Sequence, residues 1–151
     1  MNDHLRELYQ QVILDHNQYP KNFKKLDNAT CNSEGYNPLC GDRISLAVEL
    51  AGNVIQDIGF QGSGCAISKA SASVLTTMVK GKTIQEAEKL FNMFQNVITR
   101  DVGTDVDDME LGKLIVFAGV RQFPMRVKCA TLAWHTLQAA LHHQNEIVTT
   151  E

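Results

Sequence analysis

Three cysteines of this chain stand where its hydrophobic pattern changes, and all three lie beside residues typical of turns or helix starts. They are Cys40, Cys65 and Cys129. A glycine follows the first, as Gly41, and another precedes the second, as Gly64. A cysteine at a turn or a helix start is accessible, and its thiol pKa is lowered there. Any fold in which these thiols act together must bring three distant turns to one place.

The composition predicts one ordinary globular domain over residues 1–151, with a frayed tail at 146–151. Basic residues number 14 and acidic residues 17, so the net charge of −3 argues against a nucleic-acid binder that relies on phosphate contacts. No apolar run reaches the roughly 20 residues that span a bilayer, and the polar N-terminus lacks a signal segment. We therefore expect a cytoplasmic protein without a membrane partner. Thiols stay reduced in the cytosol, so four cysteines indicate metal binding or catalysis rather than disulfides.

The first part of the chain predicts a helix, a loop and a β-hairpin. Apolar residues recur at helical spacing over 3–16. Residues 21–39 are polar and rich in turn formers, which predicts a loop with room for a short edge strand around 29–33. Apolar and polar residues alternate over 44–50, and a second such run ends at Phe60 after a turn. This pattern predicts an antiparallel hairpin.

Helical periodicity dominates the rest of the chain. Thr83 and Glu86 form the pattern of a capping box, which marks a helix start. An acidic stretch at 101–110 matches no calcium-binding loop and is interpreted as a solvated loop. The predicted helices cover residues 66–80, 83–97 and 111–119, and a last helix begins near Cys129, after Pro124 interrupts the chain.

The hairpin explains how two of the three cysteines can meet. It begins just after Cys40 and ends just before Cys65, so its two outer ends bring these residues side by side. Asp42 follows two positions after Cys40, and alternate residues of an extended segment point to the same side. The spacing therefore predicts a group of Cys40, Asp42 and Cys65. Cys129 joins this group only if the last helix docks at the same end of the sheet.

Three thiolates and one carboxylate make a donor set that suits a metal. Zinc accepts mixed sulfur and oxygen ligands in tetrahedral geometry, and iron–sulfur clusters are also held by thiolates. Four negative ligands around a divalent ion leave a net charge of about −2, so such a site needs positive groups nearby. Arg126 and Lys128 precede Cys129 in the sequence and are predicted to supply that charge from behind the ligands.

Other cysteine and histidine residues are interpreted as structural. Cysteine often behaves as a small buried hydrophobe, and Cys31 lacks a glycine or basic neighbour, so it is interpreted as structural or incidental. Cys129 on its own would also be interpreted as a core residue, because it shares a helical stripe with Leu132 and Leu137. Surface or packing roles are predicted for all histidines: His4, His16, His135, His142 and His143.

Three blocks of the sequence closely resemble the NifU/IscU-type iron–sulfur scaffold family. They are residues 35–44, 62–73 and 126–134, and each contains one of the three cysteines. Residues 8–20 at the start of the chain also fit, so the resemblance covers nearly the whole sequence. Three separate blocks in the right order make the resemblance highly specific.

Two departures from the IscU pattern indicate the SufU-like branch of Gram-positive bacteria. Lys128 stands where IscU scaffolds carry a histidine that can ligate metal, and the segment between residues 82 and 126 is longer. The resemblance implies an α+β fold, with a small antiparallel sheet, expected to have three strands, packed with about five to six helices. It places a metal site at one end of the sheet.

The resemblance also implies what the site holds and does. The implied metal ligands are Cys40, Asp42, Cys65 and Cys129. Cys40 is the implied sulfur acceptor, and the implied cofactor is Zn²⁺, with a transient iron–sulfur cluster as the alternative. The implied partner is a PLP-dependent cysteine desulfurase of the SufS type, and downstream cluster assembly proteins are further candidate partners.

Three functions remain open on the sequence. In the first, the protein is a zinc-dependent sulfur acceptor, a sulfurtransferase-like partner of the desulfurase rather than a stand-alone enzyme. In the second, it is a scaffold on which a labile iron–sulfur cluster is assembled and passed to apo-proteins. In the third, zinc is purely structural. Lys128 favours the first, because a protonated lysine is a poor metal ligand.

Overall fold

The computed structural model describes residues 3–99, 112–142 and 148–149. Its elements in chain order are α1 (Asp3–Gln18), β1 (Cys31–Asn37), β2 (Asp42–Ala51), β3 (Val54–Ser63), α2 (Ala66–Val79), α3 (Ile84–Ile98), the 3₁₀-helix η1 (Gly112–Gln122), α5 (Pro124–Leu141) and β4 (Val148–Thr149). The three long strands are antiparallel, and the short β4 pairs in parallel with β1, which gives the order β3-β2-β1-β4. The predicted α+β fold with three antiparallel strands is confirmed.

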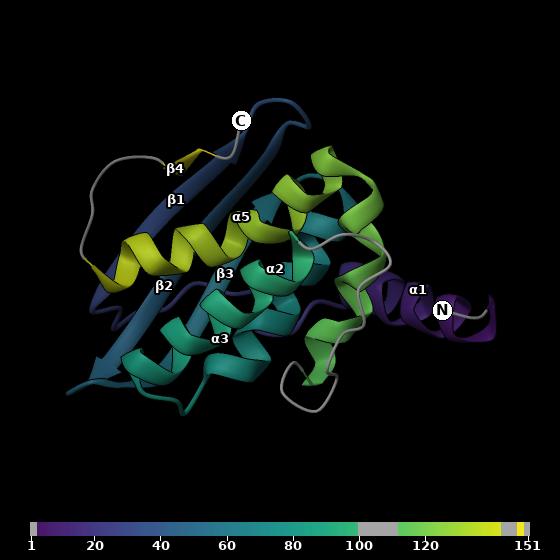
Figure 1. Cartoon of the computed structure of the whole chain (residues 1–151). Helices are drawn as coiled ribbons and strands as arrows, with labels where there is room; N and C mark the ends of the chain where they lie inside the picture. The colour runs from purple at the N-terminus through teal and green to yellow at the C-terminus, as the bar shows by residue number, and fades with distance from the viewer. Residues whose placement is uncertain (1–2, 100–111, 143–147, 150–151) are drawn as a thin grey trace.

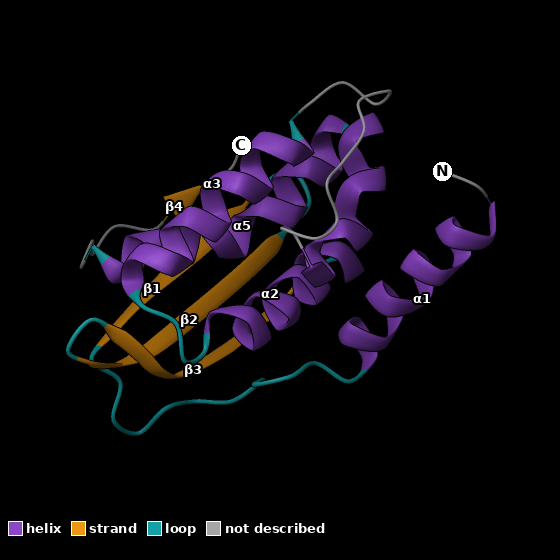
Figure 2. Ribbon diagram, turned by 60° about the horizontal axis from the view of Figure 1, so that its bottom comes forward, coloured by secondary structure: helices purple, strands orange, loops and turns teal. Residues whose placement is uncertain are grey.

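The helices cover one face of the sheet (Figure 1). α2 and α5 pack against the strands, and α3 lies outside them against α5 and η1. α1 lies at one end of the molecule (Figure 2), where it packs mainly on α2 and also contacts η1. The core lies between the sheet and α2 and α5. Its largest buried side chains include Phe60 of β3 and Trp134 of α5.

The β2–β3 hairpin forms as the alternating pattern predicts. Ile44, Leu46 and Val48 point inward and are at most 1% exposed, whereas their neighbours on β2 reach solvent. Phe60 lies opposite Leu46 and shares the inward face. Burying these side chains fixes the register, because a shift by one residue would expose the whole set.

β1 is longer than the edge strand predicted around residues 29–33. Its inward residues are small or polar, so they do not produce a hydrophobic alternation: Cys31, Ser33, Gly35 and Asn37. Gly35 has no side chain at the point where α5 approaches the strand, since a Cβ there would collide with Thr136. The edge strand predicted around residues 29–33 is therefore present, but the prediction of a loop is wrong for residues 34–37.

The starts of α3 and α5 follow local sequence signals, but α5 begins earlier than predicted. Thr83 caps α3 as predicted, because its hydroxyl accepts the Glu86 N–H at 3.1 Å and the Glu86 carboxylate accepts the Thr83 N–H at 3.0 Å. The last helix does not begin near Cys129. It begins at Pro124, whose fixed φ and missing N–H suit the first helical position. Cys129 thus lies in the second turn of α5.

Two predicted segments fall partly or wholly outside the described residues. The acidic stretch at 101–110 lies outside them entirely. In the tail that was predicted to fray, Val148 and Thr149 pair with Gly35 and Tyr36 of β1, and the remaining residues of 146–151 are not described. No helix in the described part of the chain is both long enough and apolar enough to cross a bilayer.

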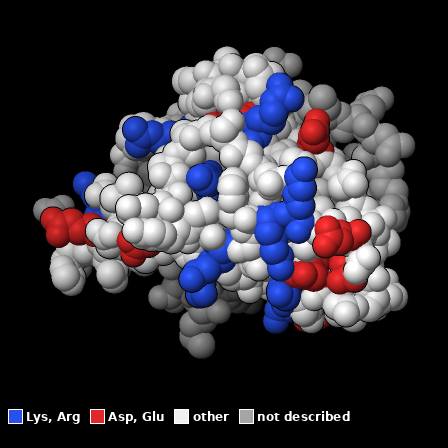
Figure 3. Space-filling view, turned by 180° about the vertical axis from the view of Figure 1, so that it is seen from behind, with Lys and Arg blue, Asp and Glu red and all other residues white. Residues whose placement is uncertain are grey.

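The outer face of the sheet is polar. Lys24 and Lys80 both pair with Asp57 of β3, at 3.3 and 3.2 Å. The Arg43 guanidinium lies 4.7 Å from the centre of the Tyr36 ring on the neighbouring strand. Seen from behind, the basic side chains are interrupted by uncharged and acidic ones (Figure 3). This face is therefore the solvated side of the sheet, and the functional residues lie elsewhere.

Candidate metal centre

Four predicted site residues meet at one end of the sheet, although each comes from a different element. Cys40 lies in the turn between β1 and β2, and Asp42 is the first residue of β2. Cys65 follows β3 and is the N-cap of α2, and Cys129 lies in α5. The β1–β2 turn and the first turns of α5 lie at the same end of the molecule (Figure 1).

The distances between these side chains suit a four-coordinate ion. The sulfur atoms of Cys129 and Cys40 are 3.4 Å apart, and Cys65 Sγ is 3.7 Å from Asp42 Oδ2. One ligand atom from each of Cys40, Asp42 and Cys129 lies within 4.8 Å of the others. Tetrahedral zinc with bonds of about 2.0–2.3 Å places its ligands about 3.3–3.8 Å apart. The donor types and these two distances therefore fit zinc, whereas Cys65 Sγ lies outside the group of ligand atoms that are all within 4.8 Å of one another.

Glycine is required where the chain passes Asp42. Gly64 has φ +147°, a conformation that other residues rarely adopt, and a Cβ there would overlap the Asp42 side chain. The close approach lets the Cys65 N–H donate to Asp42 Oδ1 at 2.7 Å. This hydrogen bond fixes the carboxylate against the start of α2, so that its other oxygen faces Cys65 Sγ.

The thiols of Cys65 and Cys129 have pKa values that are shifted in opposite directions. The pKa of Cys65 is lowered to about 7, chiefly because the Cys129 thiol donates a hydrogen bond to it, with a further contribution from the Ser68 N–H. The pKa of Cys129 is raised, because its proton is held by Cys65 and because it is buried near Asp42 and Cys40. The low thiol pKa predicted for Cys129 from a helix-start position is thus wrong, whereas the prediction holds for Cys65.

The four residues predicted to bind the metal differ strongly in exposure. Asp42 is 0% exposed and Cys129 is 2% exposed, whereas Cys40 is an exposed residue at the tip of its turn. Cys65 is intermediate. A large partner can therefore reach Cys40 more readily than the buried Asp42 and Cys129.

The two predicted basic neighbours lie at the edge of the cluster. Arg126 is exposed, and its guanidinium stacks 4.5 Å from the centre of the Phe123 ring. Lys128 is partly buried in the same helix. Their part in balancing the charge of the site stays a prediction.

Asn37 is the residue of this region that sequence reasoning missed. It is fully buried at the end of β1, and its amide Nδ2 lies 3.6 Å from Cys129 Sγ. Asn37 lies directly opposite Asp42 in the β1–β2 pairing, so both side chains point to the cluster. The signal in the sequence was the alternation of small inward residues on β1, which a search for hydrophobic alternation overlooks.

The cysteine and histidines predicted to be structural lie outside the cluster. Cys31 is buried at the opposite end of β1 from Asn37, and burial raises the pKa of its thiol. His16 bonds to Ser73 at 2.7 Å, and His142 pairs with Glu88 at 2.9 Å. His135 packs edge-on against Phe91, and His4 is exposed. These positions agree with packing and surface roles, and His143 lies outside the described residues.

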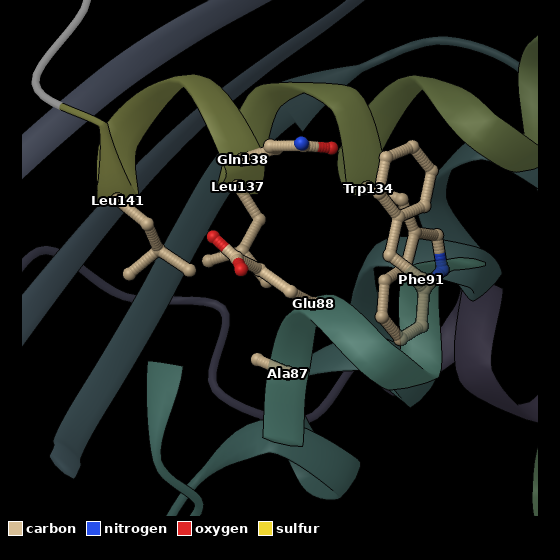
Figure 4. Close-up of a pocket in the computed structure, with 7 residues that line it drawn as sticks. All are labelled: Ala87, Glu88, Phe91, Trp134, Leu137, Gln138 and Leu141. Carbon is tan, nitrogen blue, oxygen red and sulfur yellow. The ribbon is translucent and has the colours of Figure 1, made fainter. Parts of the chain in front are cut away.

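Two hollows in the described part of the chain are lined by none of the four predicted site residues. A void of about 10 Å³ lies between α3 and α5, lined by Phe91, Trp134 and their apolar neighbours, with Glu88 and Gln138 at its side (Figure 4). It is a packing defect about the size of one water molecule. A larger hollow of about 580 Å³ separates α1 from η1 and reaches Arg126. Neither hollow is lined by a cysteine. The candidate centre is therefore the group of Cys40, Asp42, Cys65 and Cys129.

The family described as "NifU-like N terminal domain" matches residues 8–130. This chain belongs to that family. Two relatives match at similar strength over most of the chain. The zinc-dependent sulfurtransferase SufU of Bacillus subtilis is 42% identical over 91% of this chain and 91% of its own length. The iron–sulfur cluster assembly scaffold protein IscU of Streptococcus pyogenes is 40% identical over 91% of this chain and 84% of its own length.

Solved structures agree with the fold. The FiSufU protein of Fervidobacterium islandicum AW-1 superposes with a TM-score of 0.80 at 38% identity, and the match covers 93% of this chain and 99% of that one. A NifU-like N-terminal domain from Brucella abortus gives the same TM-score at 18% identity, over 93% of this chain and 96% of its own. The second likeness concerns the fold alone. The predicted membership of the NifU/IscU-type family is confirmed.

Proposed function

We propose that this protein is a zinc-dependent sulfur acceptor in iron–sulfur cluster assembly. Cys40, Asp42, Cys65 and Cys129 hold the zinc ion, and Cys40 accepts sulfur from a cysteine desulfurase. The donor set supports the metal, since ligand atoms of Cys40, Asp42 and Cys129 lie within 4.8 Å of one another and Cys65 Sγ lies 3.7 Å from Asp42 Oδ2. The name of the Bacillus subtilis relative supports the activity.

The observation that carries the proposal is the unequal exposure of the ligands. Asp42 and Cys129 are buried, whereas Cys40 lies exposed in a turn. A purely structural zinc site has no need of an exposed ligand. Sulfur transfer does need one, because the thiolate must reach a sulfur atom carried by another protein.

The transfer is a thiolate–persulfide exchange. The Cys40 thiolate attacks the outer sulfur of the desulfurase persulfide, and a new S–S bond forms at Cys40. The bond between that sulfur and the desulfurase cysteine breaks, and the cysteine leaves as a thiolate with the electron pair. The exchange needs no external oxidant or reductant. Bound zinc supplies one thing, which is to keep its cysteine ligands deprotonated at neutral pH.

The surface beside Cys40 suits a protein partner. Leu39, Phe123 and Met125 are large apolar residues that are each about half exposed near the cluster. Met125 lies one helical turn before Cys129 and so faces the same side of α5. A partner that covers these side chains would keep water from the persulfide. We propose a PLP-dependent desulfurase of the SufS type as that partner, acting in the cytoplasm, where the four free thiols stay reduced.

Desulfurase turnover tests the proposal. Zinc-loaded protein is expected to accelerate alanine release by the desulfurase without added iron, and Cys40→Ala is expected to abolish the acceleration. Cys31→Ala is the matched control, because it removes a buried thiol outside the cluster. A Cys40→Ala protein that stimulates as well as the wild type would refute the transfer role.

A second function is favoured by the similarity to IscU scaffolds. The same ligands would hold a labile iron–sulfur cluster, and the oxygen ligand Asp42 would make it easy to release. Reconstitution with iron, cysteine and a desulfurase separates the two functions. A cluster that forms on this protein and passes rapidly to an apo-acceptor would support scaffolding. Failure to retain any cluster would exclude it.

A further inference from the structure

Asn37 places an amide with one unsatisfied atom directly behind the cluster. The residue is 0% exposed, and its Nδ2 lies 3.6 Å from Cys129 Sγ. Its Oδ1 is buried and has no hydrogen-bond partner among the described residues. An unpaired buried carbonyl is unfavourable, and a leucine would fill the same volume without it. The favourable interaction of the amide is therefore the hydrogen bond that its N–H group donates to Cys129 Sγ.

N–H donors are distributed unevenly over the four ligands. The Cys65 N–H donates to Asp42, the Ser68 N–H to Cys65, and the Asn37 amide to Cys129. Within residues 3–99, 112–142 and 148–149, no N–H donor reaches Cys40, whose only polar contact is with Cys129 Sγ. A hydrogen bond to a ligating sulfur draws charge from it and fixes its orientation. Cys40 keeps the most charge on its sulfur, so it is the most nucleophilic of the three.

We propose that Asn37 is a positioning residue that holds Cys129 Sγ on the metal, so that Cys40 is the ligand that leaves and reacts. This inference rests on the proposed function, because it assumes a bound zinc ion and one departing thiolate. The donors to Asp42 and Cys65 come from the backbone, whereas Asn37 donates from its side chain. The effect of this donor can therefore be removed by a single substitution.

The arrangement of β1 explains why the amide stays in place. Asn37 is the last residue of the strand, and Pro38 begins the turn that carries Cys40. Its pairing with Asp42 fixes the backbone on one side, and α5 closes over the side chain on the other. Cys40 lies in this turn, whereas Asn37 and Cys129 belong to the strand and the helix on either side of their contact.

Asn37→Leu tests the proposal, because leucine has nearly the same shape and donates no hydrogen bond. Ser33→Ala is the matched control, since Ser33 is also buried and inward-facing on β1 and its hydroxyl has no partner among the described residues. Cobalt in place of zinc gives a sulfur-to-metal charge-transfer band. We expect this band to move to longer wavelength in Asn37→Leu and to stay in place in Ser33→Ala.

Zinc retention gives a second readout. We expect zinc affinity to fall about 10–100-fold in Asn37→Leu, as is typical when a group behind a metal ligand is lost. After one equivalent of iodoacetamide has modified Cys40, wild-type protein should keep its zinc, whereas Asn37→Leu should release it. Asn37→Ala repeats both measurements if the leucine variant does not fold.

The outcomes separate the two proposals. A folded Asn37→Leu protein with the wild-type cobalt band and wild-type zinc retention would overturn the role of Asn37, even if wild-type protein stimulates a desulfurase. Wild-type protein that shows the predicted cobalt shift on substitution but never stimulates a desulfurase would overturn the sulfur-acceptor function instead. A shift of the cobalt band of equal size in Ser33→Ala would mean that Asn37 acts only through packing, and it would also overturn the proposal.

Discussion

Replacing Gly64 with alanine should damage both the fold and the metal centre, and the structure gives the reason. The added Cβ would lie 2.8 Å from Asp42 Cα and 2.9 Å from Asp42 Cγ, and closer still to Oδ1. Asp42 is 0% exposed and is held in β2, so it has little room to move. The connection between β3 and α2 must shift instead, and it carries Cys65.

Two costs combine in Gly64→Ala. A side chain at φ +147° adopts a strained conformation, which costs about 1–3 kcal/mol. Overpacking against Asp42 adds about 1–3 kcal/mol. Gly52→Ala is the matched control, because Gly52 has φ +64° and an added Cβ would meet no atom within 4 Å. The control should lose only about 1–2 kcal/mol, from its backbone conformation.

Urea unfolding of the metal-free proteins measures these costs, and competition with a chelator measures zinc affinity. We expect Gly64→Ala to lose at least about 1 kcal/mol more than Gly52→Ala, since only the first variant is overpacked. Zinc affinity should fall in Gly64→Ala and stay at the wild-type level in Gly52→Ala. Equal losses of stability, or unchanged zinc affinity in Gly64→Ala, would refute the argument that Gly64 exists to admit Asp42.

Two other predictions concern the metal and the partner surface. Metal-free protein should still unfold cooperatively, because the buried core around Trp134 does not depend on the metal. The fluorescence of Trp134, the single tryptophan, measures this transition. Loss of the transition on zinc removal would instead support a structural zinc. Met125→Glu should raise the protein concentration needed for half-maximal desulfurase stimulation without changing zinc content. Leu8→Glu, at a similarly exposed position on α1, should not, and an equal effect of both would remove Met125 from the docking surface.

The proximity of Cys40, Asp42 and Cys65 could be predicted because it depends on one hairpin. A hairpin joins residues on either side of it whatever the rest of the fold does, and its hydrophobic alternation was strong. Cys129 could not be placed in this way. Its position depends on how α5 docks across the sheet, which is decided by contacts such as the one between Gly35 and Thr136. These contacts leave no periodic pattern in the sequence.

Two predictions from the sequence were wrong in their boundaries: the start of α5 and the extent of β1. The start of α5 was predicted near Cys129 because Pro124 was interpreted as an interruption of the chain, whereas Pro124 is the first residue of the helix. Only a short edge strand around residues 29–33 was predicted for β1, because its buried residues are small or polar and its second half resembles a loop. At the end of β1 the buried residue Asn37 contacts Cys129 rather than the hydrophobic core. Patterns of hydrophobicity therefore describe the core well and the site poorly.

The topology accounts for the inequality of the three thiols. Cys65 is fixed by the N-terminus of α2, and Cys129 by its place within α5, so moving either sulfur means moving a packed helix. Cys40 lies in a turn of four residues, 38–41, between two strands, and Gly41 in that turn has φ +72° and open space around it. The turn can change conformation while β1 and β2 keep their pairing through Asn37 and Asp42. The proposed centre would thus release the Cys40 thiolate and keep three ligands, which is the arrangement that the proposed sulfur transfer requires.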